Sequence, residues 1–146
     1  RLLCREVRDQ RGVKGVGVIG MCLTGNFAIQ LIGDESVLAA VASQPAMPFF
    51  KQGNLHMSSD DIEQSRNALD VKGPMRVLRF EDDPLCTQEK SKCVHRAFND
   101  DSNIRVQEIT LPGRGHSVLT LDFVDQSGHP TREALDNVIQ YFGSHL

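Results

Sequence analysis

Residues 15–25 read GVGVIGMCLTG, and this stretch indicates the fold more directly than any other part of the chain. Residues 15–20 combine glycine with β-branched residues, which is typical of a strand, and apolar residues with helical spacing follow over residues 27–32. The connection between the two elements is short and is flanked by Gly20 and Gly25. A strand that leads directly into a helix is the repeating unit of α/β folds.

The rest of the chain continues this alternation. Residues 37–43 (VLAAVAS) are all apolar or small, as expected for a parallel strand that is buried on both faces in the middle of a sheet. Further strands are predicted at residues 75–80 and, as a more exposed edge strand, at 103–109. Helices are predicted at about residues 2–9, 59–69 and 87–98, and from Pro130 onwards. We therefore expect a mostly parallel sheet with helices on both faces.

Two of the predicted helices have features that a structure can test. Ser59 precedes an acidic pair and is the expected N-cap of its helix, since a serine hydroxyl can accept a hydrogen bond from a free backbone N–H group. In the last helix, one predicted apolar face is made by residues at i, i+3, i+4 and i+7. These residues are Leu135, Val138, Ile139 and Phe142.

Composition restricts the class of protein. With 146 residues, 40% hydrophobic and 24% charged, the chain fits a single domain with one core. A net charge of -3 with scattered basic residues argues against nucleic-acid binding, and no apolar run is long enough to span a bilayer. The sequence contains four cysteines and no signal-peptide core, which predicts reduced thiols in a cytoplasmic protein without membrane contact. Because the chain opens close to its first strand, we also expect that N-terminal strands of the domain are missing.

Three turns carry residues with catalytic potential, and each turn follows a predicted strand. Ligands of open parallel sheets bind beyond the carboxyl ends of the strands, so these turns are expected to lie near one another. The first turn contains Cys22, the second contains Asp82 and Asp83, and the third contains His116 between glycine and serine.

Cys22 is the candidate nucleophile. Its thiol is predicted to lie at the N-terminus of a helix, where the partial positive charge and free N–H groups favour a thiolate. The alternative is that Cys22 is an unreactive, small buried residue, as free cysteines frequently are. The alternative for the acidic residues is that they only favour the formation of a turn. The alternative for His116 is that it is an ordinary loop residue.

The order of the three turns along the chain is more specific than any one of them. Nucleophile, acid and histidine follow one another in the order found in α/β-hydrolases. The segments GMCLTG, RFEDDPLC and GRGHSVLT resemble the three catalytic segments of the dienelactone hydrolase family, and the similarity extends from about Gly15 to the C-terminal helix. The chain therefore resembles the C-terminal portion of an α/β-hydrolase domain.

The resemblance implies a catalytic triad of Cys22, Asp83 and His116, with Asp82 as the alternative acid. It implies no cofactor and no metal. Thr24 stands where the family usually has glycine, and Thr120 stands about where the family often has an arginine that binds a substrate carboxylate. The second difference argues against the dienelactone substrate itself.

A triad of this kind would cleave a small-molecule ester, lactone or thioester through an acyl-enzyme. The backbone N–H of Leu23 would supply half of the oxyanion hole, and the other half normally comes from a loop after an early strand. Residues 45–57, with Phe49, Phe50 and Met57, are a candidate wall for an apolar acyl pocket. A surface loop with core anchors is the alternative interpretation.

Three other interpretations of the sequence are possible. Residues 15–20 match the dinucleotide-binding pattern G-x-G-x-x-G, but these glycines lie within the predicted strand, and the helix begins only after Cys22. A metal site at Cys86, Cys93 and His95 is disfavoured, since Cys93 and His95 would face different sides of a helix. The remaining alternative is a catalytically inactive hydrolase-like fragment or a binding module.

Overall fold

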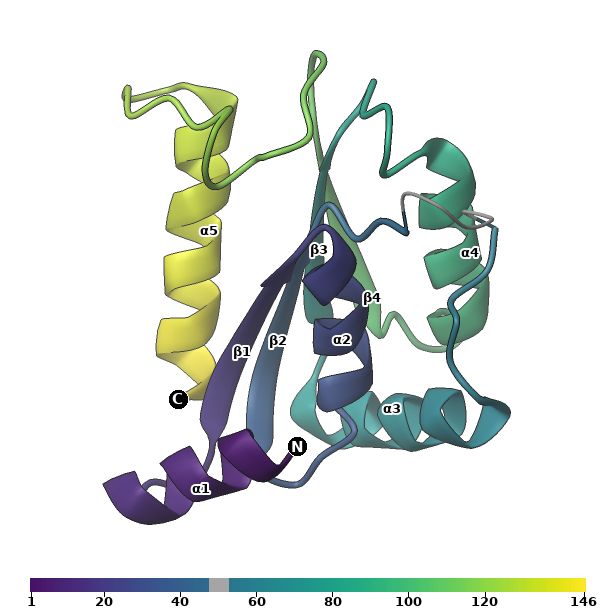
Figure 1. The fold of residues 1–146 in the computed structure, drawn as a ribbon, viewed down its shortest axis with the longest axis vertical. Coiled ribbons are helices and arrows are strands. Elements are labelled where there is room, and N and C mark those ends of the chain that lie inside the picture. The colour runs from purple at the N-terminus through teal and green to yellow at the C-terminus, as the bar shows by residue number, and fades with distance from the viewer. Residues whose placement is uncertain (48–52) are drawn as a thin grey trace.

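Strands and helices alternate along the chain in the computed structural model, which describes residues 1–47 and 53–146 (Figure 1). The helices are α1 (Leu2–Arg11), α2 (Leu23–Leu31), α3 (Ser59–Lys72), α4 (Gln88–Phe98) and α5 (Pro130–His145). The strands are β1 (Val16–Met21), β2 (Val37–Ser43), β3 (Met75–Phe80) and β4 (Val106–Leu111). Every predicted element is present, with shifts of a few residues at some ends.

The strands form one parallel sheet in the order β1-β2-β3-β4. Strand β2 lies inside the sheet between β1 and β3, and nearly all of its residues are buried. This confirms the position that its continuous apolar sequence predicted. Because all strands are parallel, their carboxyl ends lie along one edge of the sheet, where the three turns of interest emerge.

Helices cover both faces of the sheet, which confirms the predicted α/β fold class (Figure 1). Residues of α2, α3 and α4 share one buried cluster with one set of strand side chains, whereas α5 forms a second cluster on the opposite face. Neighbouring strand residues point in opposite directions, so Ala40 of β2 belongs to the first cluster and Val41 to the second.

Two helix predictions were wrong in detail. The N-cap of α3 is Ser58 and not Ser59, since the Ser58 hydroxyl accepts a hydrogen bond from the backbone N–H of Asp61. The inward face of α5 is rotated from the predicted one, so that Ile139 is 59% exposed. The buried residues of α5 are Thr131, Ala134, Val138 and Tyr141. The helix is held in this rotation by the Tyr141 hydroxyl, which accepts a hydrogen bond from the backbone N–H of Ala40.

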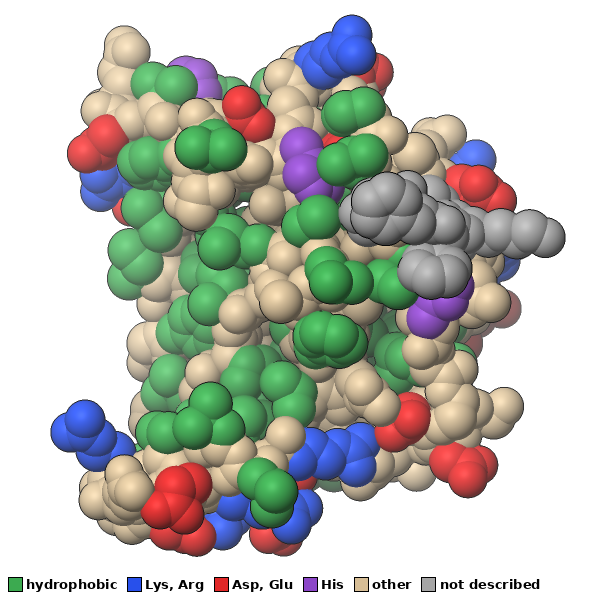
Figure 2. Space-filling view, in the orientation of Figure 1, with side chains coloured by type: hydrophobic (Ala, Val, Ile, Leu, Met, Phe, Trp, Pro, Cys, Tyr) green, Lys and Arg blue, Asp and Glu red, His purple; other side chains and the backbone are tan. Residues whose placement is uncertain are grey.

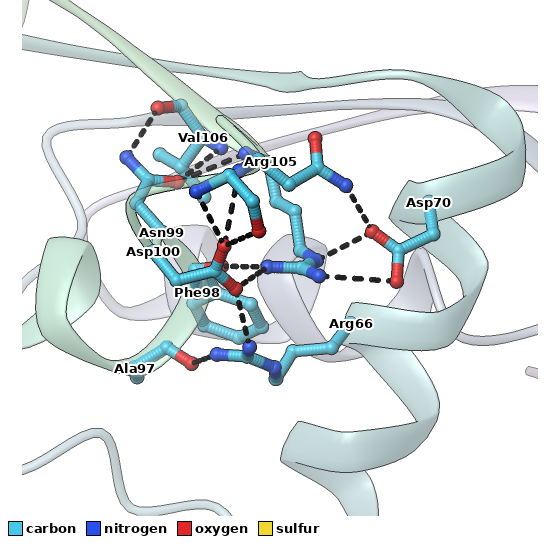
Figure 3. A network of polar contacts seen from close by, with 10 residues as sticks. Arg66, Asp70, Ala97, Phe98, Asn99, Asp100, Arg105 and Val106 are labelled. Carbon is cyan, nitrogen blue, oxygen red and sulfur yellow. Dashed lines mark hydrogen bonds and ion pairs between the residues drawn. The ribbon is translucent and has the colours of Figure 1, made fainter.

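Strand β4 begins at Val106 and not at residue 103, where it was predicted to begin. A network of polar contacts around Arg105 lies directly before the strand (Figure 3). The Arg105 guanidinium lies 2.6 Å from an oxygen of Asp70 on α3 and 2.6 Å from an oxygen of Asp100 in the turn after α4. The Asn99 side chain accepts hydrogen bonds from the backbone N–H groups of Arg105 and Val106. The turn before β4 is therefore fixed by polar contacts that the alternating pattern did not indicate.

Strand β1 is an edge of the sheet and leaves apolar side chains uncovered. Ile19 is 48% exposed and Phe27, on the neighbouring helix α2, is 53% exposed. Met21 and Leu23, on either side of Cys22, are also exposed. Figure 2 shows hydrophobic side chains gathered over β1 and between it and α5. An exposed apolar strand edge presents unpaired backbone groups that favour pairing with a further strand.

Candidate active site

Cys22 occupies the connection between β1 and α2 with a strained backbone. Its φ and ψ angles are 52° and -119°, a positive φ that residues with a side chain rarely adopt. The backbone N–H of Cys22 donates to the carbonyl of Ser43 at the end of β2, with an N···O distance of 3.1 Å. A strained residue on a sharp turn from a strand to a helix is the geometry of a nucleophile elbow.

The turn at Cys22 is held by side chains on both sides of it. The Thr24 hydroxyl accepts from the backbone N–H of Met21 at 2.9 Å and donates to the Met21 carbonyl at 2.8 Å. The buried Asn26 side chain donates to the carbonyl of Ala46 at 3.0 Å, which ties α2 to the segment after β2. The threonine that departs from the family pattern therefore makes contacts that a glycine could not make. No local sequence pattern indicated the role of Asn26.

Leu23 is the first residue of α2, directly after Cys22. The first backbone N–H groups of a helix have no carbonyl partner within the helix, so they are available to a ligand. This is the position from which the residue after a nucleophile supplies an oxyanion donor.

Asp83 and His116, which are 33 residues apart, are in direct contact. The His116 Nδ1 atom lies 2.9 Å from each carboxylate oxygen of Asp83. The Asp83 side chain is fully buried, and its Oδ1 atom also accepts hydrogen bonds from the backbone N–H groups of Leu85 and Cys86, both at 2.8 Å. Asp82 is exposed, and Asp83 is the residue of this acidic pair that contacts His116.

The loop that carries His116 is held by Asp122. One oxygen of this carboxylate accepts hydrogen bonds from the backbone N–H groups of His116 and Ser117, both at 2.8 Å. These two bonds lower the pKa of Asp122. A Cβ atom at Gly115 would lie 2.7 Å from the Phe80 ring, so a side chain there would force the ring to shift. Thr120 lies in the turn between Ser117 and Asp122, and its backbone N–H donates to the Ser117 carbonyl.

The two nitrogens of the His116 ring differ in their surroundings. Nδ1 faces Asp83, whereas Nε2 is buried and has no hydrogen-bond partner among the described residues. Cys22 and His116 follow β1 and β4 at the carboxyl edge of the sheet, but within the described part of the chain no hydrogen bond joins them.

The segment proposed as the wall of an acyl pocket, residues 45–57, begins beside the Cys22 turn, where the backbone N–H of Ala46 donates to the Cys22 carbonyl at 3.1 Å. Its apolar side chains lie elsewhere or outside the described structure. Phe49 and Phe50 are not among the described residues. Met57 packs against the core cluster of α2, α3 and α4 and lines a cavity with Ile62 and Cys93. Met57 therefore anchors the loop to the hydrophobic core.

The four cysteines are free thiols with different surroundings. Cys86 is fully buried, and its burial, together with the nearby Asp83 carboxylate, raises the pKa of its thiol to about 12. Cys4, Cys22 and Cys93 are partly exposed. The Nε2 atom of His95, a residue of the disfavoured metal site, lies 3.7 Å from Oε2 of Glu108.

A model of the family described as "Dienelactone hydrolase family" matches residues 3–146. The chain belongs to the dienelactone hydrolase family. Membership in this family supports a hydrolase function in general terms. No helix in residues 1–47 and 53–146 is long and apolar enough to cross a membrane.

Solved structures with the same fold include hydrolases. A Klebsiella pneumoniae protein described as a candidate dienelactone hydrolase superposes with a TM-score of 0.68 at 15% identity, over 96% of this chain and 57% of that one. The α/β hydrolase MGS-MChE2, from a metagenome of lagoon sediments of Mar Chica, Morocco, superposes with a TM-score of 0.59 at 15% identity. The superposition covers 96% of this chain and 66% of that one. This member of the dienelactone hydrolase family thus spans between half and two thirds of the length of these chains. No curated protein sequence matches it.

Proposed function

We propose that this protein is a carboxylic ester hydrolase in which Cys22, His116 and Asp83 form the catalytic triad. Its substrate is a small-molecule ester, lactone or thioester. The contact between Asp83 and His116 carries the proposal, because it orients the ring and leaves Nε2 without a partner. A histidine held in this way can accept a proton through Nε2 and is stabilised by the carboxylate once it is charged.

In the first half of the reaction, His116 Nε2 takes the proton of the Cys22 thiol as sulfur attacks the carbonyl carbon. The carbonyl oxygen becomes an oxyanion, which the backbone N–H of Leu23 stabilises. When the tetrahedral intermediate collapses, the bond to the leaving group breaks and His116 returns the proton to that group. The product of this half is a thioester between Cys22 and the acyl group.

In the second half, water replaces the leaving group. His116 takes a proton from water, whose oxygen attacks the thioester carbonyl, and then protonates the departing Cys22 sulfur. The free acid leaves and the resting thiol is restored. Because a nucleophilic thiol must stay reduced, we propose a reducing compartment such as the cytoplasm.

We also propose that the chain is the C-terminal portion of an α/β-hydrolase domain. The exposed apolar edge of β1 and the fraction of the neighbouring hydrolase structures that the chain spans support this. A further strand on the β1 edge would cover Ile19, and the loop that follows such a strand would supply the second oxyanion donor.

Turnover of 4-nitrophenyl acetate tests the hydrolase proposal, with mass spectrometry of rapidly quenched samples to detect an acyl group on Cys22. Cys22→Ala should abolish both acylation and turnover, and Cys4→Ala is the matched control with a partly exposed thiol on α1. A protein that neither hydrolyses esters nor becomes acylated, even when extended at its N-terminus, would instead be the inactive or binding form of the fold.

A further inference from the structure

A buried arginine lies beneath the loop that carries Asp83. Arg79 belongs to β3 and is only 4% exposed. Removing a guanidinium from water is costly unless its N–H groups find acceptors and its charge finds a partner. The described structure supplies both, and the acceptors belong to the segment next to the proposed catalytic acid.

Arg79 binds both ends of the β3–α4 loop. Its Nη2 atom donates to the carbonyl of Glu81, directly after β3, with an N···O distance of 2.8 Å. Its Nε atom donates to the carbonyl of Cys86, directly before the N-cap of α4, at 3.1 Å. Arg79 thus holds together the two points between which residues 82–85 form the acidic turn.

The contacts continue from Arg79 to the histidine through the backbone of Cys86. The carbonyl of Cys86 accepts from Arg79, and the N–H of Cys86 donates to Asp83 Oδ1 at 2.8 Å. Asp83 in turn contacts His116 Nδ1 at 2.9 Å. A displacement of Cys86 would therefore move a hydrogen-bond donor away from the carboxylate that orients the ring.

Glu108 on the neighbouring strand β4 compensates the charge of Arg79. Its Oε1 atom lies 3.9 Å from Arg79 Nη1, and the side chain of Glu108 is 11% exposed. Burial opposes the ionisation of Glu108, but its contacts with His95, Ser91 and Thr110 lower the pKa of the carboxyl. Arg79 is thereby paired on one side with a carboxylate and on the other with the two loop carbonyls.

We infer that Arg79 is a positioning residue, which holds the β3–α4 loop through Glu81 and Cys86 so that Asp83 stays against His116. The assignment of a catalytic effect rests on the proposed function. The geometric effect on His116 does not, since the Asp83 contact exists whatever the reaction.

The test uses Arg79→Met and Arg79→Lys in the full chain, with Arg76→Met as the matched control. Arg76 lies on the same strand, but its guanidinium faces the Tyr141 ring at 4.7 Å and bonds to the carbonyl of Pro74, away from the acidic turn. The first readout is the low-field NMR signal of the His116 Nδ1 proton, assigned with His116→Gln. The second readout is kcat and KM for ester hydrolysis.

We expect Arg79→Met to shift or broaden the His116 signal and to lower kcat on the order of 10- to 100-fold, with KM nearly unchanged. Arg79→Lys, which keeps the charge but loses the planar guanidinium that donates to both carbonyls, should fall between Arg79→Met and the unmodified protein. Arg76→Met should leave the His116 signal and kcat as they are.

An unchanged His116 signal in folded Arg79 variants would overturn the inference, even if their thermal stability fell, because Arg79 would then only support the sheet. If Arg79→Met does not fold, Arg79→Lys decides by the same two readouts. If the protein hydrolyses no ester even when it is extended at its N-terminus, the hydrolase proposal fails, whereas the NMR signal still decides the role of Arg79.

Discussion

Gly20 lies against the backbone carbonyl of Thr24 so closely that no side chain fits between them. A Cβ atom at Gly20 would overlap the Thr24 carbonyl group and would lie 2.9 Å from the backbone nitrogen of Gly25. The end of β1 and the first turn of α2 therefore approach each other with their backbones almost in contact. This approach is what places Cys22 at the tip of a sharp, strained turn.

Gly20→Ala should destabilise the protein and disturb the turn at Cys22, since the obstacle is backbone and cannot move aside as a side chain could. Overpacking of this kind costs on the order of 1–3 kcal/mol. Urea denaturation followed by circular dichroism measures the loss. The control is Gly143→Ala in α5, where a Cβ meets nothing within 4 Å and helix propensity favours alanine by roughly 0.5–1 kcal/mol. Equal stability of the two variants would contradict this account of the turn.

Cys22 should be the most reactive of the four thiols. Iodoacetamide at pH 7, followed by peptide mass mapping, should label Cys22 first, because it lies at a helix N-terminus and is partly exposed. Cys86 should remain unlabelled until the protein is denatured, since its burial raises the pKa of its thiol to about 12. Preferential labelling of Cys4 or Cys93, which are also partly exposed, would argue against an activated thiol at Cys22.

The proposed triad should behave as one unit in mutagenesis. Cys22→Ala and His116→Ala should each remove most ester turnover, on the order of 10⁴- to 10⁶-fold, and the double variant should lose little more. Asp83→Asn should also be severe, whereas Asp82→Asn should be mild, because only Asp83 of the two contacts His116. The reverse pattern for the two aspartates would place the acid at Asp82.

A version extended at its N-terminus should be a better catalyst than this chain alone. In this chain Leu23 is the proposed oxyanion donor, and loss of one donor typically costs on the order of 10² to 10³ in rate. A strand paired with β1 should also cover Ile19 and reduce self-association. Ester hydrolysis and sedimentation of the two versions measure both effects. Equal turnover from a monodisperse short chain would show that it builds the oxyanion site by itself.

The Arg105 network should make the protein sensitive to acid. Hydrogen bonds from Arg105 and Ser102 hold the pKa of Asp100 well below its ordinary value of 3.8. A carboxyl with a depressed pKa stabilises the fold at pH values above its unfolded pKa, and this stability is lost as the pH falls below about 4. Asp100→Asn should therefore have a lower Tm than the unmodified protein at pH 7. Between pH 5 and pH 3, its Tm should decrease less than the Tm of the unmodified protein does.

Asp136→Asn is the control for that experiment. Asp136 pairs with Arg132 on the exposed surface of α5, where an ion pair contributes little. Its Tm should follow that of the unmodified protein over the same pH range. If Asp100→Asn and Asp136→Asn behave alike, the network does not contribute to stability in the way described.

The sequence alone allowed the sheet and its helices to be predicted, because local patterns report burial. The continuous apolar run of β2 indicated a central strand, and Thr87 indicated the start of α4, where its hydroxyl accepts from the backbone N–H of Lys90. These features depend on neighbouring residues in the chain. The rotation of α5 could not be predicted in this way, because it depends on the contact of Tyr141 with Ala40, 101 residues away.

The same division applies to the candidate site. From the amino-acid pattern alone, Cys22, an acidic pair and His116 could each be placed directly after a strand. Since parallel strands direct such turns to one edge of a sheet, their common location could also be predicted. The contact of His116 with Asp83 and not with Asp82, and the hydrogen bonds from Arg79 and to Asp122 in the two loops, became visible only in the folded protein. Hydrogen bonds act over about 3 Å, here between side chains and backbone groups from different elements. Their geometry is set only when those elements have packed together.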